Sequence, residues 1–363
     1  MDLFNHLQET GHEQVVFCND KYSGLKAIIA IHDTTLGPAL GGTRMWDYVD
    51  TQSALNDVLR LSRGMTYKAA VAGLNLGGGK AVILGDPKIK SEALFRTFGR
   101  FIESLGGRYI TAEDVNINVA DMEYVATETN FVTGLSSRPG GSGDPSPVTA
   151  FGTFNGIRAA VLHRLKKDSL VNLRVGVQGA GSVGKYLCNF LTEAGAKVWI
   201  CDIDQKKVDQ VVKNCGATAV DPTQIYGLDL DVFAPCALGA VLNDETIPML
   251  KCSIVAGASN NQLKVESKHG RVLKDKNILY APDYVINAGG LINVYHEIKG
   301  YNAEIAKQQA GNIYNTLLSI FEEADRNNVS TNVASDSIAE KRIASVRQAQ
   351  SIRNNLPNQK WVS

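Results

Sequence analysis

Residues 174–184 read RVGVQGAGSVG and carry the strongest structural signal in the chain. A short apolar run leads into a loop that contains Gly179, Gly181 and Gly184, and residues 185–194 continue as an amphipathic helical pattern. This arrangement is the dinucleotide-binding fingerprint in its strand, loop and helix context. Gly179 allows a tight turn, Gly181 lets a pyrophosphate approach the backbone, and Gly184 lets the helix pack against the strand. We expect the cofactor to contact Gly179, Ala180, Gly181, Ser182, Val183 and Gly184.

An acidic residue about 20 positions beyond the glycines indicates which dinucleotide is bound. The apolar run 197–201 is followed by Asp202, whose carboxylate can accept hydrogen bonds from both ribose hydroxyls and would repel a 2′-phosphate. The sequence therefore predicts NAD rather than NADP as the cofactor. Asp204 is the alternative candidate for this role.

The sequence around the fingerprint alternates regularly between helix and strand patterns. The predicted helices cover 148–165, 182–194 and 205–214, and the predicted strands cover 173–179, 197–202, 231–234, 253–257 and 277–281. Repeated βα units of this kind predict a parallel, doubly wound sheet with right-handed crossovers. The second half of the chain is therefore predicted to be a Rossmann-type dinucleotide-binding domain.

The first half of the chain predicts a different, mixed α/β unit. Two β-rich runs within 14–33 indicate a hairpin, a glycine-rich loop follows at 34–43, and a long helical pattern covers 51–71. Residues 136–147 are rich in Gly, Pro and Ser, so we expect a connector without helix or strand there.

These patterns together predict an α/β protein of two domains. The first is an N-terminal mixed α/β substrate and oligomerisation domain over residues 1–138, with a C-terminal helix within 335–363 that packs back on it. The second is the NAD-binding Rossmann domain over residues 139–334.

The composition excludes several classes of partner. Lys and Arg total 37 of the 363 residues, and Asp and Glu also total 37, so the formal net charge is zero. Such a chain lacks the overall attraction for nucleic acid or anionic membranes, and a small-molecule ligand fits better. No apolar run approaches the roughly 20 residues of a membrane span, and the N-terminus lacks a secretory signal pattern. The six cysteines are scattered without disulfide or metal-ligand spacing, which predicts a reduced, cytoplasmic protein without a bound metal.

Two lysines among small and apolar residues are candidates for the chemistry. Lys68 lies in the segment RGMTYKAA, and Lys80 follows the triple glycine 77–79, which would let substrate or cofactor approach the backbone. Two ammonium groups held together in a sheltered cleft lower one another's pKa, so that one becomes an uncharged base while the other holds a substrate carboxylate. A surface position is the alternative for each lysine. Asp114 follows a predicted strand, where it is either a catalytic acid and base or the N-cap of the next helix.

Seven segments together resemble the glutamate/leucine/phenylalanine/valine dehydrogenase family, with the leucine dehydrogenases as the most similar branch. They are TTLGPALGGTRMW (34–46), MTYKAAVAGLNLGGGK (65–80), TAEDV (111–115), DPSPVT (144–149), PCALGAVLN (235–243), SNNQL (259–263) and YAPDYVINAGGLINV (280–294). The resemblance implies NAD-dependent, reversible oxidative deamination of an L-amino acid to a 2-oxo acid, ammonia and NADH. It also implies a homo-oligomer, an octamer or a dimer.

The resemblance assigns roles to individual residues. It implies that Lys68 binds the substrate carboxylate, that Lys80 activates the water that attacks the imine, and that Asp114 shuttles protons to and from the amino nitrogen. The implied substrate contacts are Lys68, Leu40, Gly41, Gly42, Met65, Ala112, Asn261, Leu291 and Val294. Beyond the glycine loop and Asp202, the implied cofactor contacts are Thr149, Cys236, Ala237, Asn261 and Asn287.

The resemblance also indicates the class of substrate. Glutamate dehydrogenases hold the substrate's second carboxylate with a lysine where this chain has Leu40 and a serine where it has Val294. Stranding a carboxylate against two apolar side chains would cost several kcal/mol, so an apolar amino acid is predicted. Leu40, Ala112, Leu291 and Val294 would suit leucine, isoleucine or valine.

Two departures from the family pattern leave an alternative substrate open. Asn116 stands where the family commonly has Gly, and Leu291 stands where it often has Val. Both features are similar to relatives that act on aromatic or indolic amino acids, so a phenylalanine or tryptophan dehydrogenase is the alternative. Two other classes of protein are also considered. One is a 2-hydroxy acid dehydrogenase, which needs a histidine paired with a carboxylate, and the other is a non-catalytic NAD-binding sensor.

Overall fold

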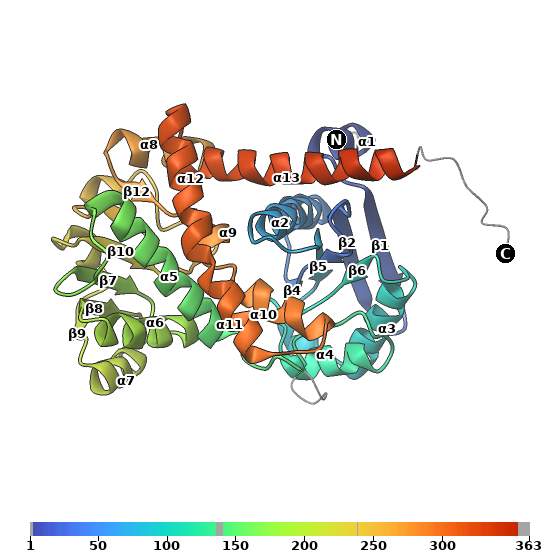
Figure 1. Cartoon of the computed structure of the whole chain (residues 1–363). Coiled ribbons are helices and arrows are strands. Elements are labelled where there is room, and N and C mark those ends of the chain that lie inside the picture. Colours follow the sequence, from blue (N-terminus) through green and yellow to red (C-terminus); the bar gives the residue numbers. More distant parts are fainter. Residues whose placement is uncertain (1–2, 136–140, 238, 355–363) are drawn as a thin grey trace. The chain divides into compact units, whose positions relative to one another are not determined.

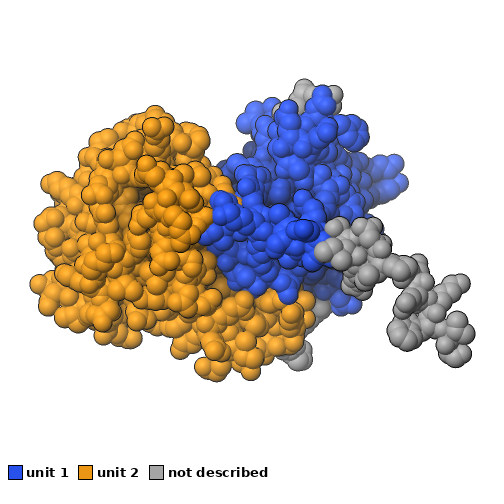
Figure 2. All heavy atoms as spheres, turned by 45° about the horizontal axis from the view of Figure 1, so that its top comes forward, with its two compact units in different colours: residues 1–133, 337–363 blue, residues 134–336 orange. Residues whose placement is uncertain are grey.

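The computed structural model describes residues 3–135, 141–237 and 239–354, and the chain divides into two compact units (Figures 1 and 2). Unit 1 comprises residues 1–133 and 337–363, and unit 2 comprises residues 134–336. Each unit has its own six-stranded sheet. The predicted mixed α/β architecture with two domains is confirmed.

Unit 2 contains a parallel sheet with the strand order β12-β11-β10-β7-β8-β9. Its strands are β7 (Arg174–Gln178), β8 (Lys197–Cys201), β9 (Thr218–Ala219), β10 (Val232–Pro235), β11 (Ile254–Val255) and β12 (Leu279–Tyr280). The chain runs outward from β7 to β9, returns to the middle as β10, and then runs outward in the other direction. This confirms the doubly wound Rossmann-type sheet, and such a sheet binds its ligand where the order reverses, here between β7 and β10.

The helices of unit 2 flank this sheet. They are α5 (Ser146–Leu165), α6 (Ser182–Glu193), α7 (Gln205–Cys215), α8 (Glu266–Asp275), α9 (Asp283–Ile286), α10 (Gly289–Ile298), α11 (Ala303–Gly311) and α12 (Ile313–Asn327), with 3-10 turns at Ile225–Gly227 and Ile247–Met249. Helices α5 and α12 lie side by side (Figure 1). Gly156 of α5 allows this packing, because a Cβ there would lie 2.5 Å from Ile286 Cγ1 and 2.8 Å from Leu317 Cδ1.

Helix α5 begins inside the stretch that we expected to hold no helix. Residues 136–140 lie outside the described residues, but the expectation is wrong at Ser146 and Pro147, which form the first turn. Proline is compatible with a first helical turn because the backbone N–H that it lacks has no partner within the helix there.

Unit 1 contains a mixed sheet with the order β1-β2-β5-β3-β6, and β4 also pairs with β5. Its strands are β1 (Gln14–Asp20), β2 (Leu25–Asp33), β3 (Ala39–Leu40), β4 (Thr43–Trp46), β5 (Gly77–Leu84) and β6 (Tyr109–Ile110). Strands β1 and β2 form the predicted antiparallel hairpin, and β3 and β4 run parallel to β5. The unit's helices are α1 (Leu3–Thr10), α2 (Thr51–Val71), α3 (Glu92–Glu103), α4 (Val119–Ala126) and a 3-10 turn at Pro87–Ile89.

Helix α2 packs across this sheet with the bounds that the sequence predicts. Its N-cap is Asp50, whose carboxylate accepts a hydrogen bond from Ser53 N at 2.7 Å. Four of its buried apolar residues, Ala54, Leu55, Val58 and Leu59, share a core with Ile28, Ala30 and Val82 of the strands. The helix positions Lys68 in its last turn.

The triple glycine of β5 lets the helix and the neighbouring backbone come unusually close. A Cβ on Gly78 would lie 2.1 Å from Thr66 N of α2, and one on Gly77 would lie 2.1 Å from Asp33 O. A Cβ on Gly79 would lie 2.6 Å from the ring of Tyr109. The expectation that these glycines open the backbone to a ligand is therefore corrected, because protein atoms occupy all three positions.

Helix α13 (Thr331–Asn354) belongs to unit 1 from residue 337 onward, where it packs against α2. The hydroxyl of Tyr67 donates to Glu340 Oε1 at 2.7 Å, and Arg342 Nη1 donates to Ala70 O at 2.8 Å. Arg342 Nη2 also donates to Asn75 Oδ1 at 3.0 Å. The residues of unit 1 that make these bonds lie just before and just after Lys68 in the sequence. The bonds therefore hold in place the C-terminal end of α2, which carries Lys68.

Substituting Gly78 tests this backbone contact. Because a Cβ at this position would overlap backbone atoms that have no room to move, we expect Gly78→Ala to lower the free energy of unfolding by at least about 3 kcal/mol. A Cβ on Gly64, in the middle of α2, would meet nothing within 4 Å, so Gly64→Ala should raise the stability by about 0.5 to 1 kcal/mol. Urea denaturation of both variants measures the difference, and equal stabilities would contradict the packing argument.

Candidate active site

An ion pair in unit 1 joins a buried lysine to a half-buried aspartate. Lys80 Nζ, on β5, is 2.6 Å from Asp114 Oδ2, and the lysine side chain is only 8% exposed. The segment that carries Asp114 is bonded to the sheet, because Thr43 N donates to Ala112 O at 2.8 Å and Met45 N donates to Val115 O at 3.1 Å. An anion thus lies within hydrogen-bonding distance of Lys80, a contact that the sequence pattern did not indicate because only the two lysines were expected to interact.

Gly41 and Gly42 make this approach possible. A Cβ on Gly42 would lie 2.6 Å from Glu113 O and 2.9 Å from Asp114 Cβ. A Cβ on Gly41 would lie 1.7 Å from Gly79 O. The two glycines therefore let the chain between β3 and β4 fit between Lys80's strand and the Asp114 segment.

The turn after Asp114 shows that this residue is not a helix cap. Ile117 N donates to Asp114 O at 2.9 Å, and α4 is capped by Asn118, which forms a capping box with Asp121. The N-cap alternative for Asp114 is therefore wrong. Asn116 within the turn has a φ of 60°, and its side-chain Nδ2 donates to Met45 O at 3.0 Å.

The φ of Asn116 also gives a physical reason for its departure from the family pattern. Glycine adopts this left-handed conformation without strain, and asparagine is among the few other residues that tolerate it. The geometry of the turn therefore accommodates asparagine as well as glycine at this position.

Arg44 is a second cation beside Asp114, and it was not among the residues predicted from the sequence. Its Nε is 3.4 Å from Asp114 Oδ2, and its Nη1 is 2.9 Å from Asp57 Oδ2. Burial tends to raise the pKa of Asp114, but Lys80 and Arg44 together outweigh that effect and lower it. The signal for Arg44 was present, since the residue lies in the segment GGTRMW.

The other predicted substrate residues divide between the two units. Leu40 and Ala112 are buried, and Met65 and Lys68 are half-buried on α2, all within unit 1. Leu291 and Val294 lie on α10 of unit 2, the first buried and the second half-buried.

The glycine loop of unit 2 joins β7 to α6 at the point where the strand order reverses. Gly179 has a φ of 111°, and a Cβ there would lie 2.8 Å from the Cys236 carbonyl after β10. A Cβ on Gly184 would lie 1.9 Å from Gly179 O. A Cβ on Gly181, the N-cap of α6, would meet nothing within 4 Å. Gly181 therefore borders open space beside a helix N-terminus, which fits a pyrophosphate.

The acid after β8 lies against this loop. Asp202 Oδ2 accepts a hydrogen bond from Ala180 N at 2.7 Å, so its carboxylate borders the glycine turn. Asp204 instead caps α7, where its Oδ1 accepts from Lys206 N at 3.1 Å. This geometry favours Asp202 over Asp204 as the ribose-binding acid.

Further candidate cofactor residues follow the carboxyl ends of the neighbouring strands. They are Cys236 and Ala237 after β10, Asn261 after β11 and Asn287 after β12, while Thr149 lies in the first turn of α5. Asn287 is buried, and its Nδ2 donates to Asn260 Oδ1 at 2.7 Å and to Ala258 O at 3.1 Å. Ser259, which was not predicted from the sequence, is buried, and its hydroxyl has no hydrogen-bond partner among the described residues. A buried hydroxyl of this kind fits a site that a cofactor completes.

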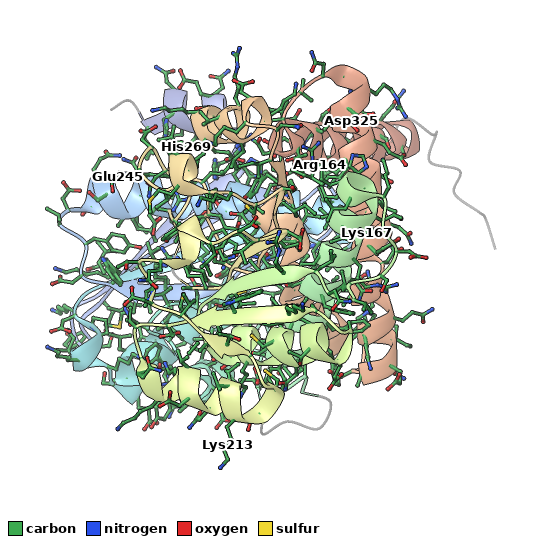
Figure 3. All side chains as sticks on the ribbon, turned by 90° about the vertical axis from the view of Figure 1, so that its left-hand side faces the viewer. Arg164, Lys167, Lys213, Glu245, His269 and Asp325 are labelled. Carbon is green, nitrogen blue, oxygen red and sulfur yellow. The ribbon has the colours of Figure 1, made fainter. Side chains whose placement is uncertain are left out.

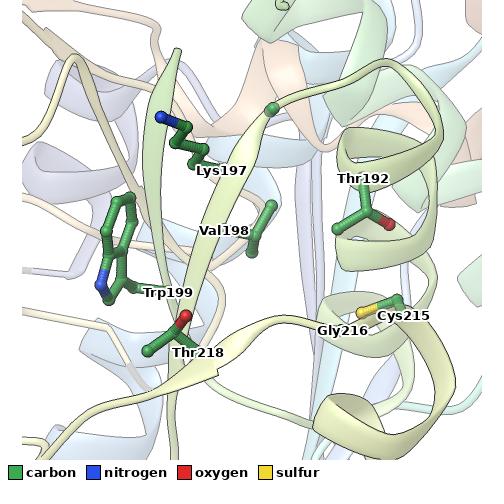
Figure 4. A pocket seen from close by; sticks show the side chains of 8 residues that line it. Thr192, Lys197, Val198, Trp199, Cys215, Gly216 and Thr218 are labelled. Carbon is green, nitrogen blue, oxygen red and sulfur yellow. The ribbon is translucent and has the colours of Figure 1, made fainter. Parts of the chain in front are cut away.

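A separate cavity of about 340 Å³ lies at the opposite end of β8 (Figure 4). Its lining residues are Thr192, Ala196, Lys197, Val198, Trp199, Cys215, Gly216 and Thr218. The cavity adjoins the C-terminal ends of α6 and α7, whereas a dinucleotide binds at the carboxyl ends of the strands.

Exposed charged side chains such as Lys213 and Glu245 project from the surface of unit 2 (Figure 3).

Neither a metal centre nor a membrane span is found in the described part of the chain. Within residues 3–135, 141–237 and 239–354, no group of three or more His, Cys, Asp or Glu side chains is arranged to hold a metal ion. Among the helices of the same residues, none combines the length and apolarity needed to cross a membrane. All six cysteines are free.

Comparisons with known proteins agree over nearly the whole chain. A model of the Glu/Leu/Phe/Val dehydrogenase dimerisation domain matches residues 12–131, and a model of glutamate/leucine/phenylalanine/valine dehydrogenase matches residues 140–204 and 199–351. The leucine dehydrogenase of Geobacillus stearothermophilus is 56% identical over 352 residues, which cover 97% of this chain and 96% of that one.

Two further relatives extend the comparison. The L-tryptophan dehydrogenase of Nostoc punctiforme is 53% identical over 97% of this chain and 99% of its own. A crystal structure of an L-tryptophan dehydrogenase from Nostoc punctiforme has a TM-score of 0.86 with 52% identity and covers 95% of this chain and 99% of that one. A hetero-hexameric glutamate dehydrogenase from Thermus thermophilus shares the fold, with a TM-score of 0.76 at 21% identity, covering 93% of this chain and 90% of its own.

The stability of the fold at low pH tests the ion pair. Since the pKa of Asp114 is lowered below 3.8 in the folded protein, its carboxylate stabilises the fold fully above that pH, and the contribution is lost as the pH falls through the folded pKa. We expect Asp114→Asn to be less stable than the parent chain at neutral pH, with a difference that shrinks in acid. Urea unfolding of both proteins from neutral to acidic pH measures this difference in stability. Asp209→Asn, which changes an exposed carboxylate, is the control. A difference independent of pH would contradict the assignment.

Proposed function

Because the chain belongs to the Glu/Leu/Phe/Val dehydrogenase family, we propose that it catalyses the NAD-dependent, reversible oxidative deamination of a branched-chain L-amino acid. L-Leucine is the proposed preferred substrate, with isoleucine and valine also accepted. The chain is an amino-acid dehydrogenase with a nicotinamide cofactor, so the hydroxy acid dehydrogenase and the non-catalytic sensor are set aside. The observation that carries the proposed mechanism is the contact between the buried Lys80 and Asp114.

The cofactor, when bound, supplies the hydride acceptor, and this chain's residues supply the positions and the protons. In unit 2, the backbone N–H groups at the start of α6 would bind the pyrophosphate beside Gly181, and Asp202 would bind the ribose hydroxyls. In unit 1, the Lys68 ammonium would bind the α-carboxylate of the substrate.

Asp114 and Lys80 would carry the protons. The Asp114 carboxylate would take a proton from the substrate ammonium group, and oxidation of the resulting amine at its α-carbon would leave a protonated imine. Lys80, in its uncharged form, takes a proton from the water that attacks the imine carbon. Protonated Asp114 would return its proton to the nitrogen of the resulting carbinolamine. As the C–N bond breaks and ammonia leaves, the Asp114 carboxylate would accept the proton of the hydroxyl group, and the 2-oxo acid remains. The 2.6 Å contact allows a proton to pass between the two residues during the cycle.

The apolar residues support the choice of substrate. Leu40 and Ala112 are buried beside the ion-pair strands, and neither offers a partner to a side-chain carboxylate. Leu291 and Val294 are proposed to contact the same apolar side chain. Since one methylene changes binding by only about 1 to 3 kcal/mol, activity on several branched-chain amino acids is expected.

We also propose a homo-oligomer that assembles through unit 1, as an octamer or a dimer. The family model that matches residues 12–131 describes a dimerisation domain, which supports this proposal. The six free cysteines support a reduced, cytoplasmic setting.

A substrate panel tests the proposed function. We expect NADH formation, followed by absorbance, with L-Leu, L-Ile and L-Val, and much lower kcat/KM with L-Phe, L-Trp and L-Glu. Lys80→Met should lower kcat by about 10²- to 10⁴-fold because it removes the general base. Turnover of glutamate alone would contradict the pocket argument, and a preference for L-Trp would establish the aromatic alternative. Near-parental turnover by Lys80→Met would overturn the mechanism.

Cofactor binding tests the proposed role of the glycine loop. A methyl group on Gly181 enters the space assigned to the pyrophosphate, so Gly181→Ala should raise the KM for NAD about tenfold or more while leaving the melting temperature unchanged. Gly184→Ala is the contrasting variant, because its Cβ would collide with Gly179 O and destabilise the fold. The parent enzyme should prefer NAD to NADP. A preference for NADP would refute the Asp202 assignment.

A further inference from the structure

Arg44 connects two carboxylates, one in the proposed catalytic pair and one outside it. On β4, its Nη1 lies 2.9 Å from Asp57 Oδ2 and its Nε lies 3.4 Å from Asp114 Oδ2, with the side chain 20% exposed. Lys80 Nζ meets the same Asp114 oxygen from β5 at 2.6 Å. Two cations on two strands therefore converge on one carboxylate oxygen.

Asp57 is itself held firmly on α2. Its Oδ2 accepts a hydrogen bond from the Tyr48 hydroxyl at 2.8 Å, and its Oδ1 accepts one from Arg60 Nη2 at 3.0 Å. The Asp57 side chain is 17% exposed, whereas that of Arg60 is 58% exposed. An anchored carboxylate thus fixes the guanidinium group from the side opposite to Asp114.

The two cations beside Asp114 differ in what they can do during turnover. Lys80 is proposed to lose its proton in the cycle, whereas a guanidinium group keeps its charge at every working pH. When Lys80 is uncharged, Arg44 still provides a positive charge at the Asp114 oxygen. Burial opposes the charge on Arg44, but Asp114 and Asp57 outweigh it and raise the Arg44 pKa.

We propose that Arg44, anchored by Asp57, is a positioning residue that orients the Asp114 carboxylate, keeps it ionised, and thereby influences the pH at which the Lys80–Asp114 pair becomes active. This inference rests on the proposed function, since it assigns Arg44 a role in the same reaction.

The charges around Asp114 determine the direction of the pH effect. The groups that face it are Lys80 from β5, Arg44 from β4, and Tyr109 from β6, whose pKa is raised by burial, with Asp57 and Tyr48 behind Arg44. Removing Arg44 deletes a positive charge and leaves Asp57 without its counterion on that side. Both changes favour the protonated form of the Lys80–Asp114 pair, so the acidic limb of kcat/KM must move to higher pH.

The kinetic experiment compares Arg44→Met, Arg44→Lys and Asp57→Asn in the full-length enzyme with L-Leu and NAD. Arg44→Met should lower kcat about 10- to 100-fold and raise the acidic limb by about 1 pH unit. Arg44→Lys should restore the position of the limb because it restores the charge, and Asp57→Asn should shift the limb in the same direction as Arg44→Met but less. Arg60→Gln, which removes a solvent-exposed partner of the same Asp57, is the matched control and should shift the acidic limb much less than Arg44→Met. Melting temperatures and NADH binding identify any variant that misfolds.

A second measurement does not depend on turnover. The ¹³C carboxyl resonance of Asp114, assigned by its absence in Asp114→Asn, should titrate at higher pH in Arg44→Met than in the parent chain. An unchanged titration and an unchanged acidic limb in a folded Arg44→Met would overturn the inference, as would an equal shift in Arg60→Gln. If the parent chain turned over no amino acid, the proposed function would fail, while this titration would still decide whether Arg44 holds the charge of Asp114.

Discussion

Close backbone packing around β5 is the constraint on which the site of unit 1 depends. Gly77, Gly78 and Gly79 sit against atoms of β2, α2 and β6, and Gly41 and Gly42 sit against Gly79 and the Asp114 segment. No side chain larger than hydrogen fits at these positions. Because the backbones approach this closely, the buried Lys80 and the half-buried Asp114, from different elements, can meet at 2.6 Å. Unit 2 also depends on close backbone packing at a glycine. Gly184 fits against Gly179 and so positions the N-terminus of α6 at the edge of the sheet.

The sequence predicted the fold well where the local pattern was strong. The helix over Thr51–Val71, the hairpin of β1 and β2, and the βα units around β7 and β8 follow from hydrophobic period and turn residues alone. The C-terminal helix was also expected, whereas the helices α8 to α12, between residues 266 and 327, were not predicted. The sequence motifs also identified Lys80 and Asp114 as candidate catalytic residues. They did not predict the contact between the two side chains, because that contact depends on the register of strands far apart in the sequence.

Arg44 and the glycines show why part of the site could not be predicted. A glycine in a sequence shows that a side chain is absent, but it does not show whether a ligand or the protein fills the space. The triple glycine was interpreted in favour of a ligand, and the structure fills that space with Thr66, Asp33 and Tyr109. The sequence does not single out Arg44, because its two carboxylate partners, Asp57 and Asp114, come from separate elements.

Substrate choice and chemistry are separable in this fold, and the comparisons illustrate why. A leucine dehydrogenase and a tryptophan dehydrogenase are 56% and 53% identical to this chain, so overall identity does not distinguish their substrates. The proposed roles of Lys68, Lys80 and Asp114 concern only the carboxylate and amino groups that all L-amino acids share. The selection therefore falls to a few apolar positions, of which Leu40 and Ala112 are buried in unit 1. Because the turn geometry accommodates asparagine as well as glycine at position 116, Leu291 is the departure that still bears directly on the size of the substrate side chain.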